Sequence, residues 1–447
     1  MTNSRTNMAE GGSGTLSPQA GQNGTAGLVA RRRLLLGPNV PTFYQSPIHI
    51  VRGKGVWLWD NDGRRYLDCY NNVPHVGHCH PRVVEAISMQ CATLNTHTRY
   101  LHSGILEYLE SVLPTFDDQL GCGLLTCSGS EANDVALRMA QSFTGHSGFI
   151  ATDSTYHGNT ALVSQLDRRG GPVGGLEAHV VRVPCPVGES TRYKKTVSRE
   201  SRSFAASVAV AVSQLEERRQ GCAALILCPF FANEGFPTLP KGFLDQTVEI
   251  VQAAGGVVIC DEVQPGFGRL GSHFWGHERI GIVPDIVTLG KPMGNGHPVA
   301  GVIARPDVLG AFRQDYKYFN TFAGNPVAVA AAQATLDCIR EDGLIENART
   351  VGSHARRKLQ ELAEIWDCLG VVRGSGMYFG VEVCDSDGLP AGRMAGRIVN
   401  AMRDLGVLIG TAGRYGSILK IRPPLPISVA EIDILAETLH RALKGTK

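Results

Sequence analysis

Two apolar stretches decide how this chain folds, VVICDE at residues 257–262 and IVTLGK at residues 286–291. Each begins with four apolar or β-branched residues and then reaches a charged side chain, Asp261 in the first and Lys291 in the second. Short, continuous apolar runs are typical of strands that are buried on both faces of a parallel sheet. Because ligands bind at the carboxyl ends of such strands, we expect Asp261 and Lys291 to meet at one edge of one sheet.

The chemistry of this pair has two interpretations. A carboxylate at a buried strand end is costly unless a cation lies near it, so the pair could be a plain salt bridge. It could also hold pyridoxal phosphate, which requires a Lys that bonds the cofactor as a Schiff base and an Asp that keeps its pyridine nitrogen protonated. The neighbouring motifs favour the second interpretation.

A turn that could hold a phosphate lies between an apolar run and a predicted helix, and it has the sequence SGSEAN at residues 128–133. Gly129 would let the backbone approach a ligand closely. The N–H groups of Gly129 and Ser130 would then face the ligand at the positive end of the helix dipole. An ordinary cap formed by Ser128 explains the turn equally well. Its position at a strand end favours the phosphate site.

Two further segments supply candidates for cofactor binding. The triplet YHG at residues 156–158 follows an apolar run, and the ring of Tyr156 could stack on a flat cofactor, with His157 beside it. Thr321 precedes a long apolar helix, and its hydroxyl could bind the phosphate group. An ordinary loop aromatic and a helix-entry Thr are the structural alternatives.

Apolar runs alternate with helical periodicity through the middle of the chain, which predicts one doubly wound α/β domain at about residues 128–321. The strands are expected at 124–127, 148–152, 180–183, 223–228, 257–261, 286–289 and 299–303, and the helices at 131–143, 203–219 and 242–254. A helix at 81–94 and short strands at 48–51 and 56–59 precede the domain. Helices at 326–339, 344–362 and 429–442 and strands at 377–383 and 417–421 follow it.

Composition restricts the class of protein. The chain has 447 residues, 43% hydrophobic and 19% charged, which is normal for a soluble enzyme of several domains. A net charge of +2 gives no electrostatic reason to expect nucleic acid or a membrane surface as a partner. Twelve cysteines without a CxxC pair predict free thiols in a reducing cytoplasm. No apolar run reaches the roughly 20 residues of a membrane helix.

Together these features resemble the class III, ornithine-aminotransferase-like, pyridoxal-phosphate enzymes of fold type I. The similarity runs from about residue 44 to the C-terminus and is most specific at DEVQPGFGR, residues 261–269, followed by Gly290 and Lys291. It implies a mostly parallel seven-stranded sheet in a large domain and a small α+β domain built from both termini. The implied boundaries are a large domain at 86–330 and the two parts of the small domain at 28–85 and 331–447. Residues 1–27 are rich in Gly, Ser, Asn and Thr and poor in apolar side chains, which predicts a disordered tail.

The resemblance also implies the role of each residue. Asp261 would pair with the pyridine nitrogen, Val263 would pack on the ring, and Gln264 would bond the ring hydroxyl. Gly129 and Ser130 would hold the phosphate, with Ser128 in the same cofactor site, while Tyr156 would stack on the outer face. Thr321 would reach the phosphate of the neighbouring subunit, which implies a homodimer with its active sites at the interface.

One branch of the family is most similar. The segments 71–81, 98–102, 291–298 and 318–321 resemble the phospho-lyases that act on O-phosphoethanolamine and 5-phosphohydroxylysine. Ornithine-type transaminases hold the substrate α-carboxylate with an Arg before a C-terminal Pro-Pro, and here Lys420 takes that place. Phosphoethanolamine has no α-carboxylate but carries a dianion, so its pocket should hold cations. The candidates, each of which could instead be structural, are His75, Arg99, Arg269, His297, Lys420 and Arg422.

The primary hypothesis is therefore a phospho-lyase that gives aldehyde, ammonia and phosphate. An ω-amine:keto-acid transaminase is the runner-up, and a cofactor-binding protein without catalysis is the third, which intact Lys291 and Asp261 argue against. The usual Glu-Pro of the family is Cys228-Pro229 here, and this departure puts the choice of substrate in doubt. A His-x-x-His-x-His pattern at 75–80 has no regular ligand geometry, so we expect no metal.

Overall fold

The computed structural model describes residues 24–167, 179–186 and 197–445. The chain divides between Ile50 and Val51 into two compact units. The first contains helix α1 (Thr25–Leu36), in which no residue is buried. The expected disordered tail is therefore wrong for residues 25–27, which begin this helix, and its residues 1–23 lie outside the described part of the chain.

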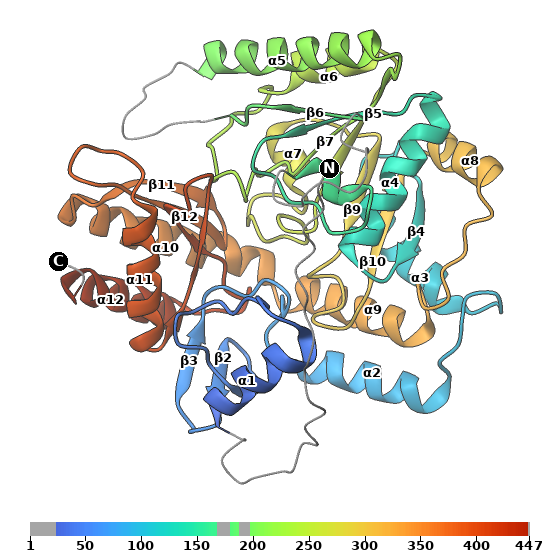
Figure 1. The fold of residues 1–447 in the computed structure, drawn as a ribbon. Coiled ribbons are helices and arrows are strands. Elements are labelled where there is room, and N and C mark those ends of the chain that lie inside the picture. Colours follow the sequence, from blue (N-terminus) through green and yellow to red (C-terminus); the bar gives the residue numbers. More distant parts are fainter. Residues whose placement is uncertain (1–23, 168–178, 187–196, 446–447) are drawn as a thin grey trace, which may run out of the picture. The chain divides into compact units, whose positions relative to one another are not determined.

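A seven-stranded sheet forms the centre of the second unit (Figure 1). Its order is β4-β10-β9-β8-β7-β5-β6, and only β10 runs antiparallel to its neighbours. This confirms the predicted, mostly parallel sheet. The strands are β4 (Cys122–Thr126), β5 (Gly148–Thr152), β6 (Val180–Val183), β7 (Cys222–Leu227), β8 (Val257–Asp261), β9 (Ile286–Leu289) and β10 (Ala300–Ala304).

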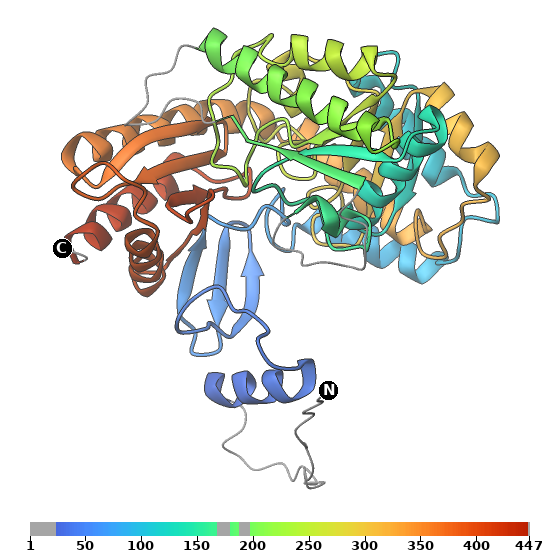
Figure 2. The ribbon, with the colours of Figure 1, turned by 45° about the horizontal axis from the view of Figure 1, so that its top comes forward.

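Helices cover this sheet because its strands are apolar on both faces. Helix α4 (Gly129–Thr144) packs with α8 (Pro306–Asp315) and contacts strands β7 to β10. Helices α5 (Val197–Glu217) and α6 (Asp245–Ala253) lie side by side and contact strands β5 to β8 (Figures 1 and 2). Between the sheet and α4 lies an apolar core, which includes Phe149, Ile226 and Ile259.

Two smaller sheets complete the second unit. One has the order β1-β2-β3-β13, and Leu67 of β3 lies opposite Val407 of β13 in a parallel pair, so both ends of the chain contribute to it (Figure 2). The other has the order β11-β12-β15-β14. The strands are β1 (Ile50–Lys54), β2 (Trp57–Asp60), β3 (Arg65–Asp68), β11 (Leu369–Ser375), β12 (Tyr378–Val383), β13 (Val407–Leu408), β14 (Gly410–Ala412) and β15 (Ile418–Ile421).

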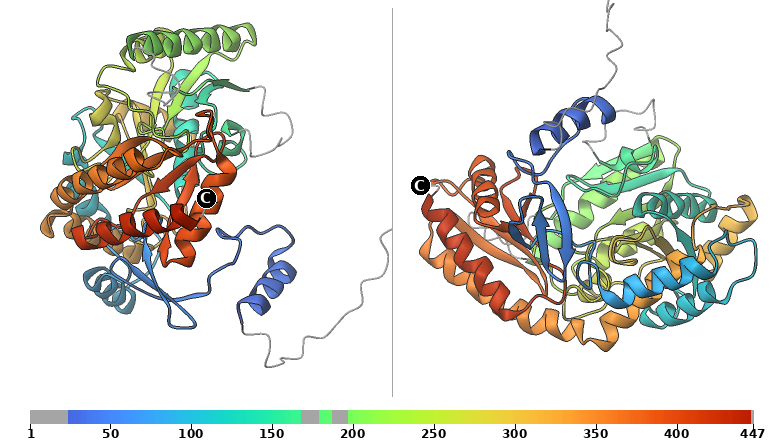
Figure 3. Two further views of the ribbon diagram at one scale, coloured as in Figure 1. Left: turned by 90° about the vertical axis from the view of Figure 1, so that its left-hand side faces the viewer. Right: turned by 90° about the horizontal axis from the view of Figure 1, so that it is seen from below.

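The remaining helices connect and cover these sheets. Helix α9 (Pro326–Glu341) packs along α2 (Pro81–Thr93) and α3 (Ser103–Val112), as the views in Figure 3 show. Helices α10 (Leu344–Ile365), α11 (Gly392–Asp404) and α12 (Val429–Gly445) pack together beside the C-terminal sheet. The short ones are η1 (Leu113–Thr115), η2 (Val163–Leu166) and α7 (Gly276–Ile280). Within the described residues, no helix has the length and apolar character needed to span a bilayer.

Candidate active site

Asp261 lies at the carboxyl end of β8, and three neighbouring elements orient its buried carboxylate. Its Oδ2 accepts hydrogen bonds from His157 Nδ1 at 2.7 Å and from Asn133 Nδ2 at 3.0 Å. Its Oδ1 accepts the backbone N–H of Val263 at 3.0 Å. Asn133 is itself fixed, because the hydroxyl of Thr288 on β9 donates to its Oδ1 at 2.7 Å. The carboxylate is therefore held rigidly before any ligand binds.

Lys291 follows β9 and lines the same pocket as Asp261. Burial lowers the pKa of its amine, and Arg422 adds to this effect while Asp261 opposes it. The loop that begins at Lys291 is attached to the N-terminal segment by one residue, Asn295. The Oδ1 of Asn295 accepts the N–H of Val76 at 3.0 Å, and its Nδ2 donates to the carbonyl of Gly77 at 2.9 Å. A lowered pKa favours the neutral amine, which is the form that can act as nucleophile or base.

The predicted phosphate turn begins helix α4. Ser128 forms a capping box with Glu131: Ser128 Oγ accepts the N–H of Glu131, and the Glu131 carboxylate accepts the N–H of Ser128, both at 3.2 Å. Ser128 therefore caps the helix and is not among the residues that line the pocket. Gly129 and Ser130 do line it, so the N-terminal end of α4 faces the ligand site, as anion binding requires.

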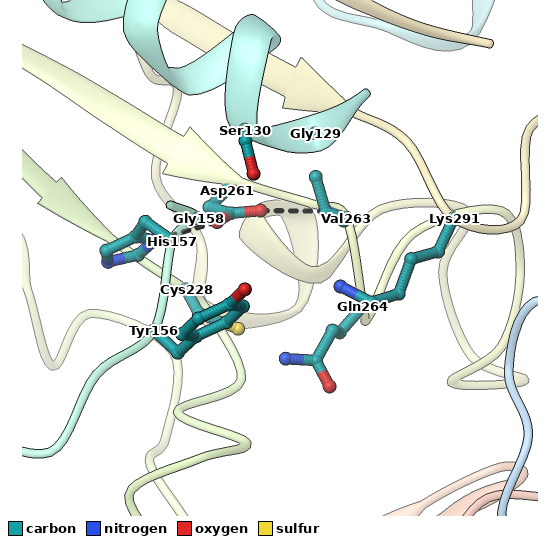
Figure 4. A pocket seen from close by; sticks show the side chains of 10 residues that line it. All are labelled: Gly129, Ser130, Tyr156, His157, Gly158, Cys228, Asp261, Val263, Gln264 and Lys291. Carbon is teal, nitrogen blue, oxygen red and sulfur yellow. Dashed lines mark hydrogen bonds and ion pairs between the residues drawn. The ribbon is translucent and has the colours of Figure 1, made fainter. Parts of the chain in front are cut away.

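A pocket of about 100 Å³ connects these groups, and its other lining residues are Tyr156, His157, Gly158, Cys228, Val263 and Gln264. In Figure 4, Tyr156 and Val263 lie on opposite sides of the space, and the Lys291 amine points into it. Two glycines keep the space open. A Cβ at Gly158, where φ is +142°, would lie 2.5 Å from Ser130 Oγ, and a Cβ at Gly129 would lie 3.1 Å from the Val263 methyl groups.

This donor set fits pyridoxal phosphate. A helix N-terminus suits its phosphate, an aromatic ring and an apolar side chain suit the two faces of its ring, and a buried carboxylate suits its pyridine nitrogen. The amine of Lys291 would bond its aldehyde. The residues that would hold it are thus Gly129, Ser130, Tyr156, Val263 and Asp261, with Gln264 and His157 beside them.

A second cavity of about 680 Å³ adjoins the first and shares Tyr156, Gly158, Gln264 and Lys291 with it. Two predicted substrate residues, Lys420 and Arg422, lie in its wall and are almost fully buried. Lys420 Nζ donates to Asn233 Oδ1 at 3.1 Å and to Gln264 Oε1 at 3.3 Å. Within the described residues, neither Lys420 nor Arg422 forms a salt bridge with a carboxylate.

Gln264 connects the two cavities, and its partners determine which way its amide points. Its Oε1 accepts from Arg422 Nη1 and from the Tyr378 hydroxyl, both at 2.7 Å, in addition to Lys420. An amide oxygen must face these donors, so Nε2 is the donor end of the side chain; it gives one hydrogen to Asn233 Oδ1 at 3.4 Å and has a second hydrogen to donate. An N–H donor is what a ring hydroxyl or phenolate oxygen would need, which agrees with the role expected for Gln264.

Two other predicted substrate residues lie outside both cavity linings. Arg269 is fully buried and donates to the carbonyls of Met377 and Pro423 and to His75 Nδ1. Burial lowers the pKa of Arg269 to about 9. His75 is also fully buried and bonds the Phe267 carbonyl at 2.7 Å, and burial lowers the pKa of its imidazole. The pair joins distant segments behind the site and does not reach the substrate space.

The remaining candidates lie at the surface of the described chain. Arg99 is exposed and lies over the ring of Phe319, 4.1 Å from its centroid. Thr321 is exposed and His297 is half-buried, and neither is among the lining residues of the two cavities described above. The structure therefore brings together two of the six predicted substrate residues, Lys420 and Arg422, and separates them from the other four.

Several residues of the substrate cavity were not singled out from the sequence, among them Tyr70 and Asn233. The carbonyl of Tyr70 accepts from Arg422 Nε at 2.7 Å, and the guanidinium lies over the Tyr70 ring. Asn233 comes six residues after strand β7, so its position near a strand end was a usable signal. Tyr70 comes two residues after β3, a strand that was not among those predicted.

A possible metal group lies elsewhere among the described residues and consists of His80, Cys338 and Asp342. His80 Nδ1 is 3.4 Å from the thiol, whereas its Nε2 is 3.6 Å from the Asp342 carboxylate. The two imidazole nitrogens thus face different partners, and Arg82 already pairs with Asp342. We assign no ion to this group.

Comparison with known proteins gives a consistent set of similarities. The family model for class III aminotransferases matches residues 41–443. An alanine–glyoxylate aminotransferase 2-like protein of Drosophila melanogaster is 37% identical over 409 residues, which cover 89% of this chain and 83% of that protein. The ethanolamine-phosphate phospho-lyase homolog 1 of Caenorhabditis elegans is 34% identical over 421 residues, 89% of each chain. An Arthrobacter phospholyase, solved in complex with phosphoethanolamine, has a TM-score of 0.90 at 42% identity and covers 93% of this chain and 99% of its own.

Proposed function

The chain belongs to the class III aminotransferase family, and on this premise we propose that it is a phospho-lyase acting on O-phosphoethanolamine or a similar phosphorylated amine. Members of this family use pyridoxal phosphate, and so does this chain. The proposed products are an aldehyde, ammonia and inorganic phosphate. Two of the similar proteins described above carry phospho-lyase names, and one was solved with phosphoethanolamine.

The observation that carries the proposal is the pair of buried cations in the substrate cavity. Lys420 and Arg422 both donate to one amide oxygen, that of Gln264, and within the described chain neither has a carboxylate partner in a salt bridge. Two buried cations that share a neutral acceptor repel each other, and burial lowers the pKa of Lys420 well below its usual value, with Arg422 adding to the effect. A phosphate dianion would neutralise both charges.

The amide at position 233 supports the same substrate. A carboxylate there would neutralise Lys420 and leave the cavity with one effective positive charge, suited to a monoanion. The Asn233 amide accepts a hydrogen bond at 3.1 Å without cancelling the charge. The cavity therefore retains the charge that a dianion needs, and charge complementarity of this kind selects a substrate by penalising the wrong one.

In the proposed reaction the residues of the chain have separate tasks. The cofactor supplies an electron sink for the electrons released at the substrate carbon that bears nitrogen. Lys291 Nζ takes the proton from that carbon, for which its lowered pKa suits it. Asp261 holds the proton on the ring nitrogen. Lys420 and Arg422 bind the phosphate and stabilise the charge it gains when the bond between the adjacent carbon and oxygen breaks. With one water, phosphoethanolamine then yields acetaldehyde, ammonia and phosphate.

The test is to incubate the holoenzyme with phosphoethanolamine and measure free phosphate and ammonia together. We expect the two products in equal amounts, and we expect a Lys420→Met variant to lose most of this activity while it keeps its cofactor. Rapid amino transfer to a keto acid without phosphate release would reject the proposal.

One observation favours the runner-up, an ω-amine:keto-acid transaminase. The Drosophila protein described above, which is named for aminotransferase activity, has the higher identity of the two relatives, 37%. In this reaction Arg422 would bind the carboxylate of the keto acid. Full conversion of the cofactor to its amine form by phosphate-free amines, reversed by a keto acid at a catalytically competent rate, would support it.

We also propose that the enzyme works as a homodimer. Thr321 is exposed and lies outside the cofactor pocket of its own chain. Large apolar side chains are exposed near it in sequence and in the 97–102 loop that contacts Phe319, among them Leu101, Tyr100 and Phe322. Mixed dimers of Lys291→Ala and Thr321→Ala chains should recover one intact site if Thr321 acts on the partner. None of the twelve cysteines, all of which lie in the described part of the chain, forms a disulfide, which supports a reducing cytoplasm as the location.

A further inference from the structure

A row of buried side chains runs from Asp261 across the ends of three neighbouring strands to Glu234. His157 Nδ1 bonds Asp261 Oδ2 at 2.7 Å, and His157 Nε2 bonds Thr155 Oγ1 at 2.7 Å (Figure 4 shows the first of these). Thr155 in turn bonds the carboxylate of Glu234, which also accepts from Thr152 Oγ1 at 2.8 Å. All of these side chains are buried.

The number of hydrogens in this row is limited, because a hydroxyl donates only one. Asp261 accepts, so Nδ1 of His157 carries a hydrogen. When Glu234 is ionised, the Thr155 hydroxyl donates to it, and Nε2 must donate to Thr155, which makes His157 an imidazolium. When Glu234 is protonated, it donates to Thr155, and the Thr155 hydroxyl donates to Nε2 of a neutral imidazole. The two states interconvert when one hydrogen moves from Nε2 to Thr155 and another from Thr155 to Glu234.

We propose that Glu234 is a positioning residue for the cofactor: through Thr155 it sets the charge of His157 and thereby how firmly Asp261 holds the proton on the ring nitrogen. The inference requires cofactor binding, but it does not depend on whether elimination or amino transfer follows. It also gives a use to a buried carboxylate that the proposed reaction leaves without a task. For the resting enzyme we assign the first state, in which Glu234 is ionised and Nε2 of His157 carries a hydrogen.

The surroundings of Glu234 are consistent with a balance between the two states. Burial raises its pKa, while Thr152 and the positive charge at His157 lower it. The other titratable or charged groups around it are Cys228, Cys185 and Lys420, and Asp153 and Arg414 lie near Cys185. Burial raises the pKa of Cys185 to about 12 and that of Cys228 still further, so both thiols stay neutral.

The first test is a pH titration of the visible absorption band of the Lys291-bound cofactor. Thr155→Val keeps the shape of the side chain and removes the hydroxyl, and Glu234→Gln keeps the shape and removes the charge. Each should raise the spectral pKa by about 0.5–1 unit, because each leaves His157 neutral and so removes a positive charge near the cofactor. Thr155→Ser, which restores a hydroxyl, should titrate like the unaltered enzyme.

The double variant distinguishes an effect of Glu234 that passes through Thr155 and His157 from a direct electrostatic effect of the Glu234 charge on the cofactor. If the hydroxyl and the carboxylate act in series, Thr155→Val with Glu234→Gln should shift the titration no further than either change alone. Additive shifts would overturn the proposal, and so would a shift in Glu234→Gln without one in Thr155→Val, or no shift in either.

A second measurement needs no bound cofactor. In the apoprotein labelled with ¹⁵N-histidine, the His157 signals can be assigned by their absence in His157→Asn. We expect Nε2 to have the chemical shift of a protonated nitrogen, and to change to that of an unprotonated nitrogen in Glu234→Gln. The same Nε2 shift in both proteins would refute the proposal even if the holoenzyme variants proved unstable.

Discussion

The sharpest consequence of the cavity's charge is the effect of Asn233→Asp. This change keeps the shape of the side chain and places a carboxylate where an amide oxygen now lies 3.1 Å from Lys420 Nζ. At an effective dielectric constant of about 20, unit charges about 3 Å apart attract each other by about 5 kcal/mol. The new carboxylate would therefore take over Lys420 as its own partner and repel a phosphate dianion.

The expected size of the effect follows from this attraction. Asn233 lines a water-accessible cavity, which screens part of it, so we expect a loss of about 2–3 kcal/mol in phosphate binding, or a factor of about 30–150 in affinity. The pKa of Lys420, which burial now lowers well below its usual value, should rise because a carboxylate favours the charged amine.

The assay compares kcat/KM for phosphoethanolamine and competitive inhibition by inorganic phosphate in the unaltered enzyme and in Asn233→Asp. Asn233→Ser is the matched control, since it weakens the same hydrogen bond without adding charge, and it should lose much less affinity. Cofactor conversion by a phosphate-free amine should change little in either variant. If inhibition by phosphate stays within about threefold of its normal strength in Asn233→Asp, the buried cations do not bind phosphate and the argument from charge fails.

Three further predictions follow from single features. Lys420 must be protonated to attract a dianion, and burial lowers its pKa, so the affinity for phosphate should fall as pH rises through that lowered pKa. Arginine stays protonated, so Lys420→Arg should move this fall to higher pH in the kcat/KM profile. Gly158→Ala should weaken cofactor binding by more than about tenfold in a fluorescence titration, because its Cβ would lie 2.5 Å from Ser130 Oγ and its φ is +142°. Asn295→Ala removes the two side-chain hydrogen bonds between the loop after Lys291 and residues 76–77. It should cost about 1–3 kcal/mol in denaturant unfolding and also lower kcat; unchanged stability and kcat would show that the loop is fixed by other contacts.

The local sequence predicted many of the strands and helices of the fold. The strands at 148–152, 180–183, 257–261 and 286–289 have the predicted bounds, because a buried strand shows itself as an uninterrupted apolar run. Helices α3, α8 and α11 were not predicted. Helix α11, for example, contains two Gly and one Asn in thirteen residues and owes its stability to packing against α12 and β13.

The residues of the site likewise divide into those that the sequence identified and those that only the structure placed. Asp261 and Lys291 could be identified because each lies at the carboxyl end of a buried strand, and the sheet brings the strand ends together. The candidate cations could not be ranked, since a long, flexible side chain can turn either way. Arg422 turns toward the cavity and bonds Gln264, whereas Arg269 turns toward two carbonyls more than one hundred residues away in the chain.

Tertiary contacts connect the separate segments that resemble the phospho-lyases. The backbone of the 71–81 segment forms hydrogen bonds with Asn295, which lies in the loop after Lys291. The 97–102 loop contacts Phe319, which lies two residues before Thr321. A residue's own neighbours in sequence specify its strand or turn. The partner of a hydrogen bond or of a buried charge comes from another part of the chain, and only folding brings it within the 3 Å or so over which such an interaction acts.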